Sequence, residues 1–337
     1  MIIEDFSLAS VIKKTWSQIP SMRMRDRDKF TRNAGDAAKC HRQVAYKALG
    51  FKETNPPDKQ AEFKMKFGDW IEKGLMYSFT DKCGFFGVQK LATQGDSGER
   101  DTFYGTSWNG YRDLDIAILQ KNGTYKPCVV ELKSKVGKSA TMAIRETLYS
   151  KAYKIPVPDQ TFGQAQQLSL YLRDAYNKSK GSKHFTSPIV DGVLLQLLYD
   201  DYSGIQTFVE YWAEYLPEHD AVKFYRVHCH DVPEVCAHID VVIKLEDIAK
   251  RFSYQNEFIA KGELPPPEFQ RKYPVSDSRV QGAYKTTLQA AVKGQALVGD
   301  VQCKYCSFRD QCAKDCNTSL TYSEDEVKQL KAVLKNL

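Results

Sequence analysis

The sequence lacks several features that mark membrane, secreted and repetitive proteins. Its 337 residues contain no uninterrupted apolar run of about 18 residues, the length that a membrane span needs. Residues 1–5 do not have the basic and then apolar layout of a secretion signal. No internal repeat or low-complexity linker is found. We therefore expect a soluble, cytoplasmic protein with no membrane partner.

The chain also lacks a strong charge imbalance, because its net charge is only +6. Basic residues are nevertheless concentrated between positions 22 and 47. Such a stretch either neutralises phosphates or forms a solvated helix face, and charge alone does not decide between the two. The sequence contains Arg23, Arg25, Arg27, Lys29, Arg32, Lys39, Arg42 and Lys47 there, against Asp26, Asp28 and Asp36.

The composition is that of a folded protein, with 42% hydrophobic and 12% aromatic residues. Local patterns predict helices over 34–49, 63–79, 161–176 and 242–261, and a last helix that begins at Ser323. Thr161 and Gln164 form a capping-box pattern. Strand patterns cover 85–133, 190–200, 205–215 and 221–230, with a hairpin signal at Asn122-Gly123. We expect one mixed α/β domain with a helical annex.

A glutamate and a lysine lie at the end of one predicted strand, and an aspartate lies on the strand before it. Glu131 and Lys133 are two residues apart after the apolar Cys128-Val-Val, so their side chains leave the same face. The hairpin brings Asp113 or Asp115 onto the neighbouring strand, and the apolar neighbours of Asp115 favour that residue. Carboxylates are the ligands that Mg²⁺ prefers, and an adjacent lysine can stabilise developing charge. The pattern therefore predicts a metal-dependent phosphodiesterase site, although Glu-x-Lys by itself is also common on solvated strand edges.

Three further polar residues fit such a site. Glu72, on a predicted helix, could add a carboxylate, or could be an ordinary exposed helix acid. Gln167 and Tyr171 lie one turn apart beside the apolar stripe of the next helix, where Tyr171 could equally be a half-buried core aromatic.

Cysteine is the most informative residue type, with three of nine in the pattern Cys303-x2-Cys306-x5-Cys312. Cys40 could supply the fourth thiolate of a tetrahedral set. A single CxxC with a remote fourth thiol favours a 4Fe–4S cluster over structural zinc, which more often uses two CxxC pairs. Cys316 is a spare that could substitute for one of these ligands, and the others are expected to be buried apolar residues: Cys83, Cys128, Cys229 and Cys236.

Together these motifs resemble the RecB-type branch of the PD-(D/E)XK nuclease superfamily, specifically its iron–sulfur members. These are the CRISPR-associated iron–sulfur exonucleases, the AddB-type recombination nucleases and related phage exonucleases. The resemblance spans roughly residues 35–315 and also includes Leu264-Pro-Pro-Pro267. The matched residues are Asp115 (or Asp113), Glu131, Lys133, Gln167, Tyr171, Cys40, Cys303, Cys306 and Cys312.

The resemblance implies a PD-(D/E)XK core, a mixed sheet flanked by helices, at 61–262. An N-terminal helical segment, 1–60, and a C-terminal segment, 263–337, would be joined by the cluster. It implies a Mg²⁺- or Mn²⁺-dependent exonuclease that processes single-stranded DNA ends, with recombination or CRISPR adaptation proteins as partners. Asp115, Asp113, Glu131 and Glu72 would bind metal, Lys133 would act on water or charge, and Gln167 and Tyr171 would orient substrate or lysine. Separately from the resemblance, the basic stretch runs into the helix that carries Cys40, and the residues expected to bind DNA are Arg23, Arg25, Arg27 and Arg42.

One departure concerns the helix after Gly68, where many members have histidine and this chain has Glu72. The metal preference can therefore differ, since glutamate also binds Mg²⁺ and Mn²⁺ through oxygen. An endonuclease of the same fold, a catalytically silent DNA-binding module and a zinc-stabilised binding protein are the alternatives.

Overall fold

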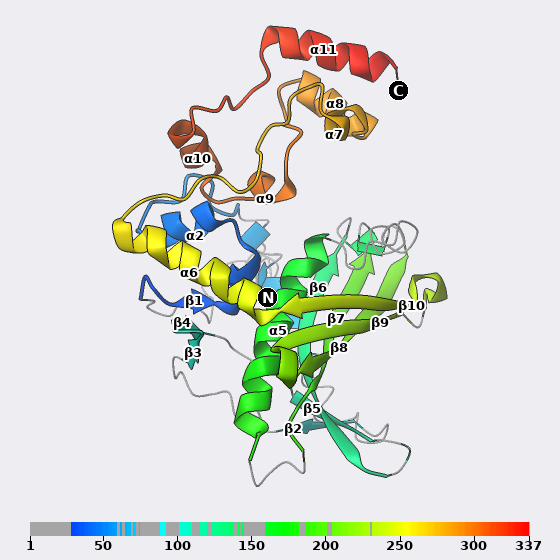
Figure 1. The fold of residues 1–337 in the computed structure, drawn as a ribbon. Coiled ribbons are helices and arrows are strands. Elements are labelled where there is room, and N and C mark those ends of the chain that lie inside the picture. Colours follow the sequence, from blue (N-terminus) through cyan, green and yellow to red (C-terminus); the bar gives the residue numbers. More distant parts are fainter. Residues whose placement is uncertain are drawn as a thin grey trace, which may run out of the picture.

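The computed structural model describes residues 28–58, 61–62, 65–68, 70–71, 74, 88–91, 101–109, 115–119, 121, 123–137, 140–141, 143–144, 159–181, 187–200, 204–229 and 231–336. It has a mixed sheet flanked by helices, with a separate group of C-terminal helices beyond one end (Figure 1). The prediction of a mixed α/β fold is confirmed at this level. In the described part of the chain, no helix is both long and apolar enough to span a membrane.

The main sheet has seven strands among the described residues, in the order β10-β9-β8-β7-β6-β5-β2. Only β6 and β7 pair in parallel, and the long helix α5, Asp159–Ser179, lies between them in the chain. The other neighbouring strands pair antiparallel. The strands are β2 Val88–Leu91, β5 Asp115–Leu119, β6 Tyr125–Val136, β7 Asp191–Asp200, β8 Ile205–Leu216, β9 Ala221–His228 and β10 Ala237–Lys244.

A smaller sheet lies beside the main one. It has the order β1-β4-β3, from β1 Arg32–Asn33, β3 Asp101–Phe103 and β4 Thr106–Asn109. Phe103 and Trp108 of this sheet are buried in the main core. The 3-10 helix η1, Ala34–Ala38, follows β1, and α2, His41–Ala48, follows η1.

Helix α5 covers one face of the main sheet. Gly192 on β7 allows this, because a Cβ there would lie 2.9 Å from the Leu172 side chain. Gly163 similarly allows η1 to approach α5, since its Cβ would lie 2.5 Å from that of Ala38. Alternation places the α5-facing residues of β7 at even numbers, and Leu194 and Leu198 belong to the same core.

The opposite face of the sheet has its own apolar cluster, built on Ile116, Cys128, Val130 and Val193. These positions alternate with the α5-facing ones along β5, β6 and β7. Strand β6 is therefore buried on both sides over its middle, which explains its nearly continuous apolar run.

Two predicted helices have different boundaries in the structure. The one over 34–49 is broken by extended backbone at Lys39, which separates η1 from α2. The one over 242–261 begins only at Leu245, because 242–244 belong to β10, a strand that the sequence analysis missed. Helix α6, Leu245–Lys261, ends at the left-handed Gly262 rather than at the prolines that follow.

The start of α5 also differs from the prediction. The helix begins at Asp159, so Thr161 lies inside it and is not its N-cap. The last helix begins where it was predicted, with Ser323 as its N-cap: Ser323 Oγ accepts from the Glu326 amide and Glu326 in turn accepts from the Ser323 amide.

The C-terminal helices form a second hydrophobic cluster, which includes Val280, Leu288 and Leu330. Figure 1 shows α7, α8 and α11 away from the sheet, with α9 and α10 nearer to α2. Their bounds are α7 Ser278–Gln281, α8 Lys285–Val292, α9 Val301–Lys304, α10 Arg309–Asp315 and α11 Glu324–Lys335; the short 3-10 helices are η3 Pro217–His219 and η4 Pro233–Val235.

Candidate functional site

The predicted acid and lysine lie on the α5-facing side of β6. In the parallel register Glu131 is opposite Leu194 and Lys133 is opposite Gln196, which are both even-numbered positions of β7. Glu131 is only 7% exposed, and its carboxylate forms an ion pair with the Lys133 amine. The Glu131 carboxylate and the Lys133 amine therefore form a pair on the face of the sheet that α5 covers.

The strand register adds one predicted acid to this face. Asp115 is the first residue of β5 and is opposite Val129, two positions before Glu131 and on the same side of the sheet. The alternative ligand Asp113 and the helix acid Glu72 lie outside the described residues.

The helical residues 65–68 run beside β6 just after the lysine. A Cβ on Gly68 would lie 3.2 Å from Ser134 Oγ, so glycine allows this close approach. The helix expected over 63–79 is thus present in its described part, against the strand that carries Glu131 and Lys133.

Polar residues of α5 approach the same region. Gln167 Nε2 donates to the Tyr171 hydroxyl at 3.0 Å, which joins the two predicted residues directly. Tyr171 is buried, as expected for a half-buried core aromatic or for a residue held inside a site.

A second glutamine pair was not identified from the sequence. Gln196 is only 1% exposed and donates through Nε2 to Gln164 Oε1 at 2.6 Å. It is the ladder partner of Lys133, so this amide pair links α5 to β7 next to the candidate lysine. The signal in the sequence was a single glutamine inside the apolar run Val193-Leu-Leu-Gln-Leu-Leu198.

Cys40 lies near Cys303, Cys306 and Cys312, although more than 260 residues separate it from them in the sequence. Burial is the main factor that raises the pKa of Cys303, Cys306 and Cys312, and Cys40 is a neighbouring negative group that adds to the effect in all three. The pKa rises to about 12 for Cys303 and for Cys312. All four are free thiols and partly buried.

This donor set matches the chemistry of a thiolate-bound metal centre. Within the described residues, no group of three or more Cys, His, Asp or Glu side chains is arranged so that it could hold a metal ion. Cys303, Cys306 and Cys312, whose pKa values are raised, are costly to ionise without a cation, whereas metal binding deprotonates and pairs thiols. By residue type, four cysteines are a donor set that iron–sulfur clusters and zinc ions use.

The remaining cysteines have other surroundings. Cys128 and Cys229 are buried in apolar clusters or beside them, as predicted. Cys236 is half-buried, with its Sγ 3.2 Å from the Cys229 amide and 3.6 Å from His228 Nδ1. Cys316 contacts the Cys312 thiol and helps to raise its pKa. Cys83 lies outside the described residues.

Helix α2, which follows Cys40, is joined to the C-terminal segment by a buried polar network. Arg42 Nε donates to the Tyr46 hydroxyl at 3.0 Å, and Arg42 Nη1 donates to the Pro265 carbonyl at 3.0 Å. The Tyr46 hydroxyl donates to Asp315 at 2.5 Å, and its ring stacks on Phe308 with 5.2 Å between centroids. Burial and the bond to Asp315 raise the pKa of Tyr46, which keeps the hydroxyl a donor.

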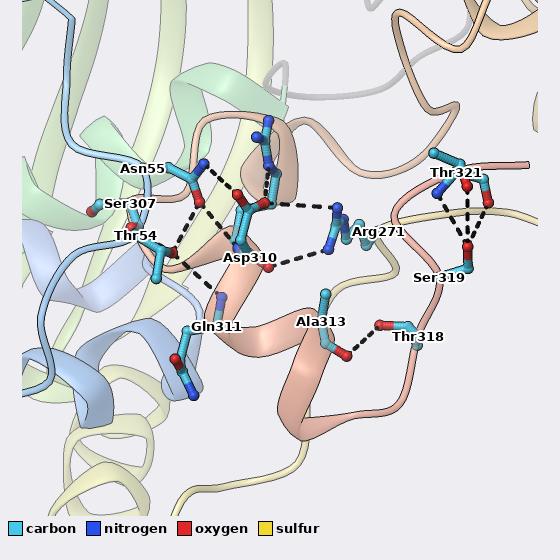
Figure 2. Close-up of polar contacts among 11 residues, drawn as sticks. Thr54, Asn55, Arg271, Ser307, Asp310, Gln311, Ala313, Thr318, Ser319 and Thr321 are labelled. Carbon is cyan, nitrogen blue, oxygen red and sulfur yellow. Dashed lines mark hydrogen bonds and ion pairs between the residues drawn. The ribbon is translucent and has the colours of Figure 1, made fainter.

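A second contact lies next to the cysteine loop. The amides of Thr54 and Asn55 donate to the Ser307 carbonyl at 3.0 and 2.8 Å. Figure 2 shows Asp310 between Asn55, which binds it through two 3.0 Å hydrogen bonds, and Arg271. Residues 54–55 and 307–310 are therefore held together independently of any metal.

These contacts change the interpretation of Arg42. It is 8% exposed, and its guanidinium contacts Tyr46, Pro265 and Asp315. The expectation that it binds DNA is therefore corrected, because a phosphate would have to replace buried protein partners. Arg32 is also buried, and Lys39 pairs with Asp36 at 2.8 Å. Arg23, Arg25 and Arg27 lie outside the described residues.

Replacing Arg42 with Gln is expected to lower the free energy of unfolding by about 1–3 kcal/mol, because buried partners lose charge-assisted hydrogen bonds. The matched control is Lys47→Gln on the same helix, where the lysine is exposed. Urea unfolding measures both. The salt dependence of single-stranded DNA binding should not change in Arg42→Gln, and a shallower slope with full stability would restore the phosphate role.

The chain was compared with protein families, curated proteins and solved structures. No family model matches the chain, and no curated protein matches it. Among solved structures, the crystal structure of SSO0001 is similar with a TM-score of 0.36 and 13% sequence identity, over 91% of this chain and 96% of that one.

Proposed function

We propose that this protein is a Mg²⁺- or Mn²⁺-dependent deoxyribonuclease of the PD-(D/E)XK type that acts on single-stranded DNA ends. The observation that supports it most is the strand register. It brings the position of Asp115, the buried Glu131 and Lys133 to one side of neighbouring strands. The polar side chains of Gln164, Gln167 and Tyr171 on α5 lie in the region that covers this side.

In this proposal Glu131 and Asp115 hold the metal ion. A bound Mg²⁺ or Mn²⁺ would supply an activated water and neutralise charge on the phosphate oxygens. Lys133, which is paired with Glu131, would have its amine at the metal face, where it can orient water or stabilise the developing charge. The hydrogen bond between Gln196 and Gln164 joins strand β7 to helix α5 next to that amine.

We further propose that Cys40, Cys303, Cys306 and Cys312 hold a 4Fe–4S cluster with a structural role. The support is the electrostatic influence of Cys40 on the other three cysteines and the polar contacts that fix both chain segments around them. The cluster would join the segment before the sheet to the segment after α6, in place of additional buried surface.

The test is digestion of end-labelled linear single-stranded DNA with increasing Mg²⁺ or Mn²⁺, beside a circular substrate of the same sequence. An exonuclease degrades the linear substrate only, and loses this activity in EDTA. Cleavage of the circle would identify an endonuclease of the same fold. Binding without cleavage at any metal concentration would favour a catalytically silent DNA-binding module.

A further inference from the structure

The loop between the first two cysteines of the cluster carries a strongly exposed aromatic ring. Tyr305 is 76% exposed, although it lies between Cys303 and Cys306, which are both partly buried. The Lys304 amine is 5.5 Å from the centre of its ring. The loop therefore exposes an aromatic ring and a cation beside two partly buried cysteines.

A second exposed aromatic lies at the same corner of the molecule. Phe51 is 41% exposed and packs edge-on against Tyr46, with 5.1 Å between ring centroids. Tyr46 stacks on Phe308, and the Thr54 amide binds the Ser307 carbonyl. Residues 51–54 are thus held beside residues 304–308 by these contacts. Lys52, which follows Phe51, is exposed.

The charge at this corner is mainly positive. Asp310 is engaged by Asn55, Arg309 and Arg271, which leaves Glu53 as an exposed carboxylate. Apart from Arg309, which pairs with Asp310, the exposed cations are Lys47, Lys52 and Lys304. Exposed rings between cations form the usual surface for single-stranded nucleic acid, because bases stack on aromatics while phosphates contact amines.

We propose that Phe51, Lys52, Lys304 and Tyr305, here called the cysteine-loop platform, bind a single strand of DNA. At least one base stacks on Tyr305, and the flanking phosphates contact Lys304 and Lys52. This inference rests on the proposed function for its choice of DNA as the partner. Stacking and phosphate contacts do not read base edges, so the platform tolerates different sequences.

Fluorescence anisotropy measures the affinity of the protein, purified anaerobically with its iron–sulfur cluster, for a fluorescein-labelled oligothymidylate. EDTA is present, so that no strand is cut during the measurement. Tyr305→Ala should raise the Kd by about tenfold, since one stacked base is lost, whereas Tyr305→Phe should stay within about twofold. The combined Lys52→Gln and Lys304→Gln variant should make the salt slope less steep by about two.

Tyr284→Ala is the matched control. Tyr284 is also followed by a lysine and is 72% exposed. It lies directly before α8, among the C-terminal helices that form the second hydrophobic cluster. Its affinity for DNA should equal that of the parent protein. Iron content and visible absorbance, measured on every variant, should be the same as in the parent.

An unchanged Kd in Tyr305→Ala, or an equal loss in Tyr284→Ala, would overturn the platform. If Tyr305→Ala loses its metal, the lysine variant decides: an unchanged affinity and salt slope would reject the proposal. Cleavage assays in Mg²⁺ separate this result from the proposed function. A nuclease whose binding ignores Tyr305 contradicts the platform alone, and a Tyr305-dependent binder that never cuts contradicts the nuclease alone.

Discussion

Replacing Glu131 with Gln, or Lys133 with Ala, is expected to lower the rate of metal-dependent DNA cleavage by about 100- to 1,000-fold or more. Metal ligands and charge-stabilising amines act on the transition state, so their loss reduces the rate more than the binding. Glu131→Gln keeps the volume of a nearly buried side chain, which leaves the fold intact. Single-turnover cleavage and DNA affinity in EDTA measure the two effects separately.

The matched control for Lys133 is Lys126→Gln. Lys126 belongs to the same strand, but it lies at the strand's start, where it pairs with Asp191 at 2.7 Å. Its cleavage rate should stay within about twofold of the parent, because a partly exposed surface pair contributes little. Full activity of Glu131→Gln would show that β6 does not carry the site.

The strand register makes the same experiment more specific. Asp115 is opposite Val129, on the side of Glu131, so Asp115→Asn should be inactive and Asp113→Asn only impaired. The reverse order of activities would mean that the metal is held two residues before Asp115 in the sequence.

Replacing any one of Cys40, Cys303, Cys306 or Cys312 with Ser is expected to remove the metal centre and lower the melting temperature, on the order of 10 °C. The segment around Cys40 and the C-terminal segment would then keep polar contacts between them, among them the Arg42–Tyr46–Asp315 network and the Asn55–Asp310 bonds. Iron and acid-labile sulfide analysis of anaerobically purified protein, with visible absorbance, measures the centre, and calorimetry measures the stability.

Cys316→Ser and Cys236→Ser are the controls for this series. Cys316 touches the Cys312 thiol but is the spare cysteine, so its variant should keep the metal. Cys236 lies near His228 and Cys229, away from the cluster residues. Zinc without iron in the parent protein would replace the cluster by a zinc site, and retention of metal by all four ligand variants would reject the thiolate centre.

Local signals explain which parts of the fold could be predicted. The hairpin before β6 follows from Asn122-Gly123, with Gly123 at a φ of +80° that glycine adopts without strain. The start of the last helix at Ser323 needs only neighbouring residues, and it is found as predicted. Strand β10 was missed because its Ala237–Lys244 sequence, followed directly by α6, has no turn residue between strand and helix.

In the candidate site, too, some features follow from local sequence and others depend on how distant elements pack. Alternation along β6 requires Glu131 and Lys133 to share a face, since successive side chains of any strand point to opposite sides. The amide pair of Gln164 and Gln196 depends on the packing of α5 on β7, which no local pattern encodes. Arg42 was assigned to DNA because a basic run is the same in sequence whether it is solvated or buried.

The sequence by itself determined the chemistry available to this protein: one acid-x-Lys strand, a hairpin before it and a thiol set with metal-ligand spacing. Only the tertiary structure decided which of these groups meet. It brought Cys40 to three cysteines more than 260 residues away, and it buried Arg42 between Tyr46 and Asp315. The physical reason is that propensity and alternation act over a few residues, whereas the contacts between distant segments depend on how whole helices and strands pack.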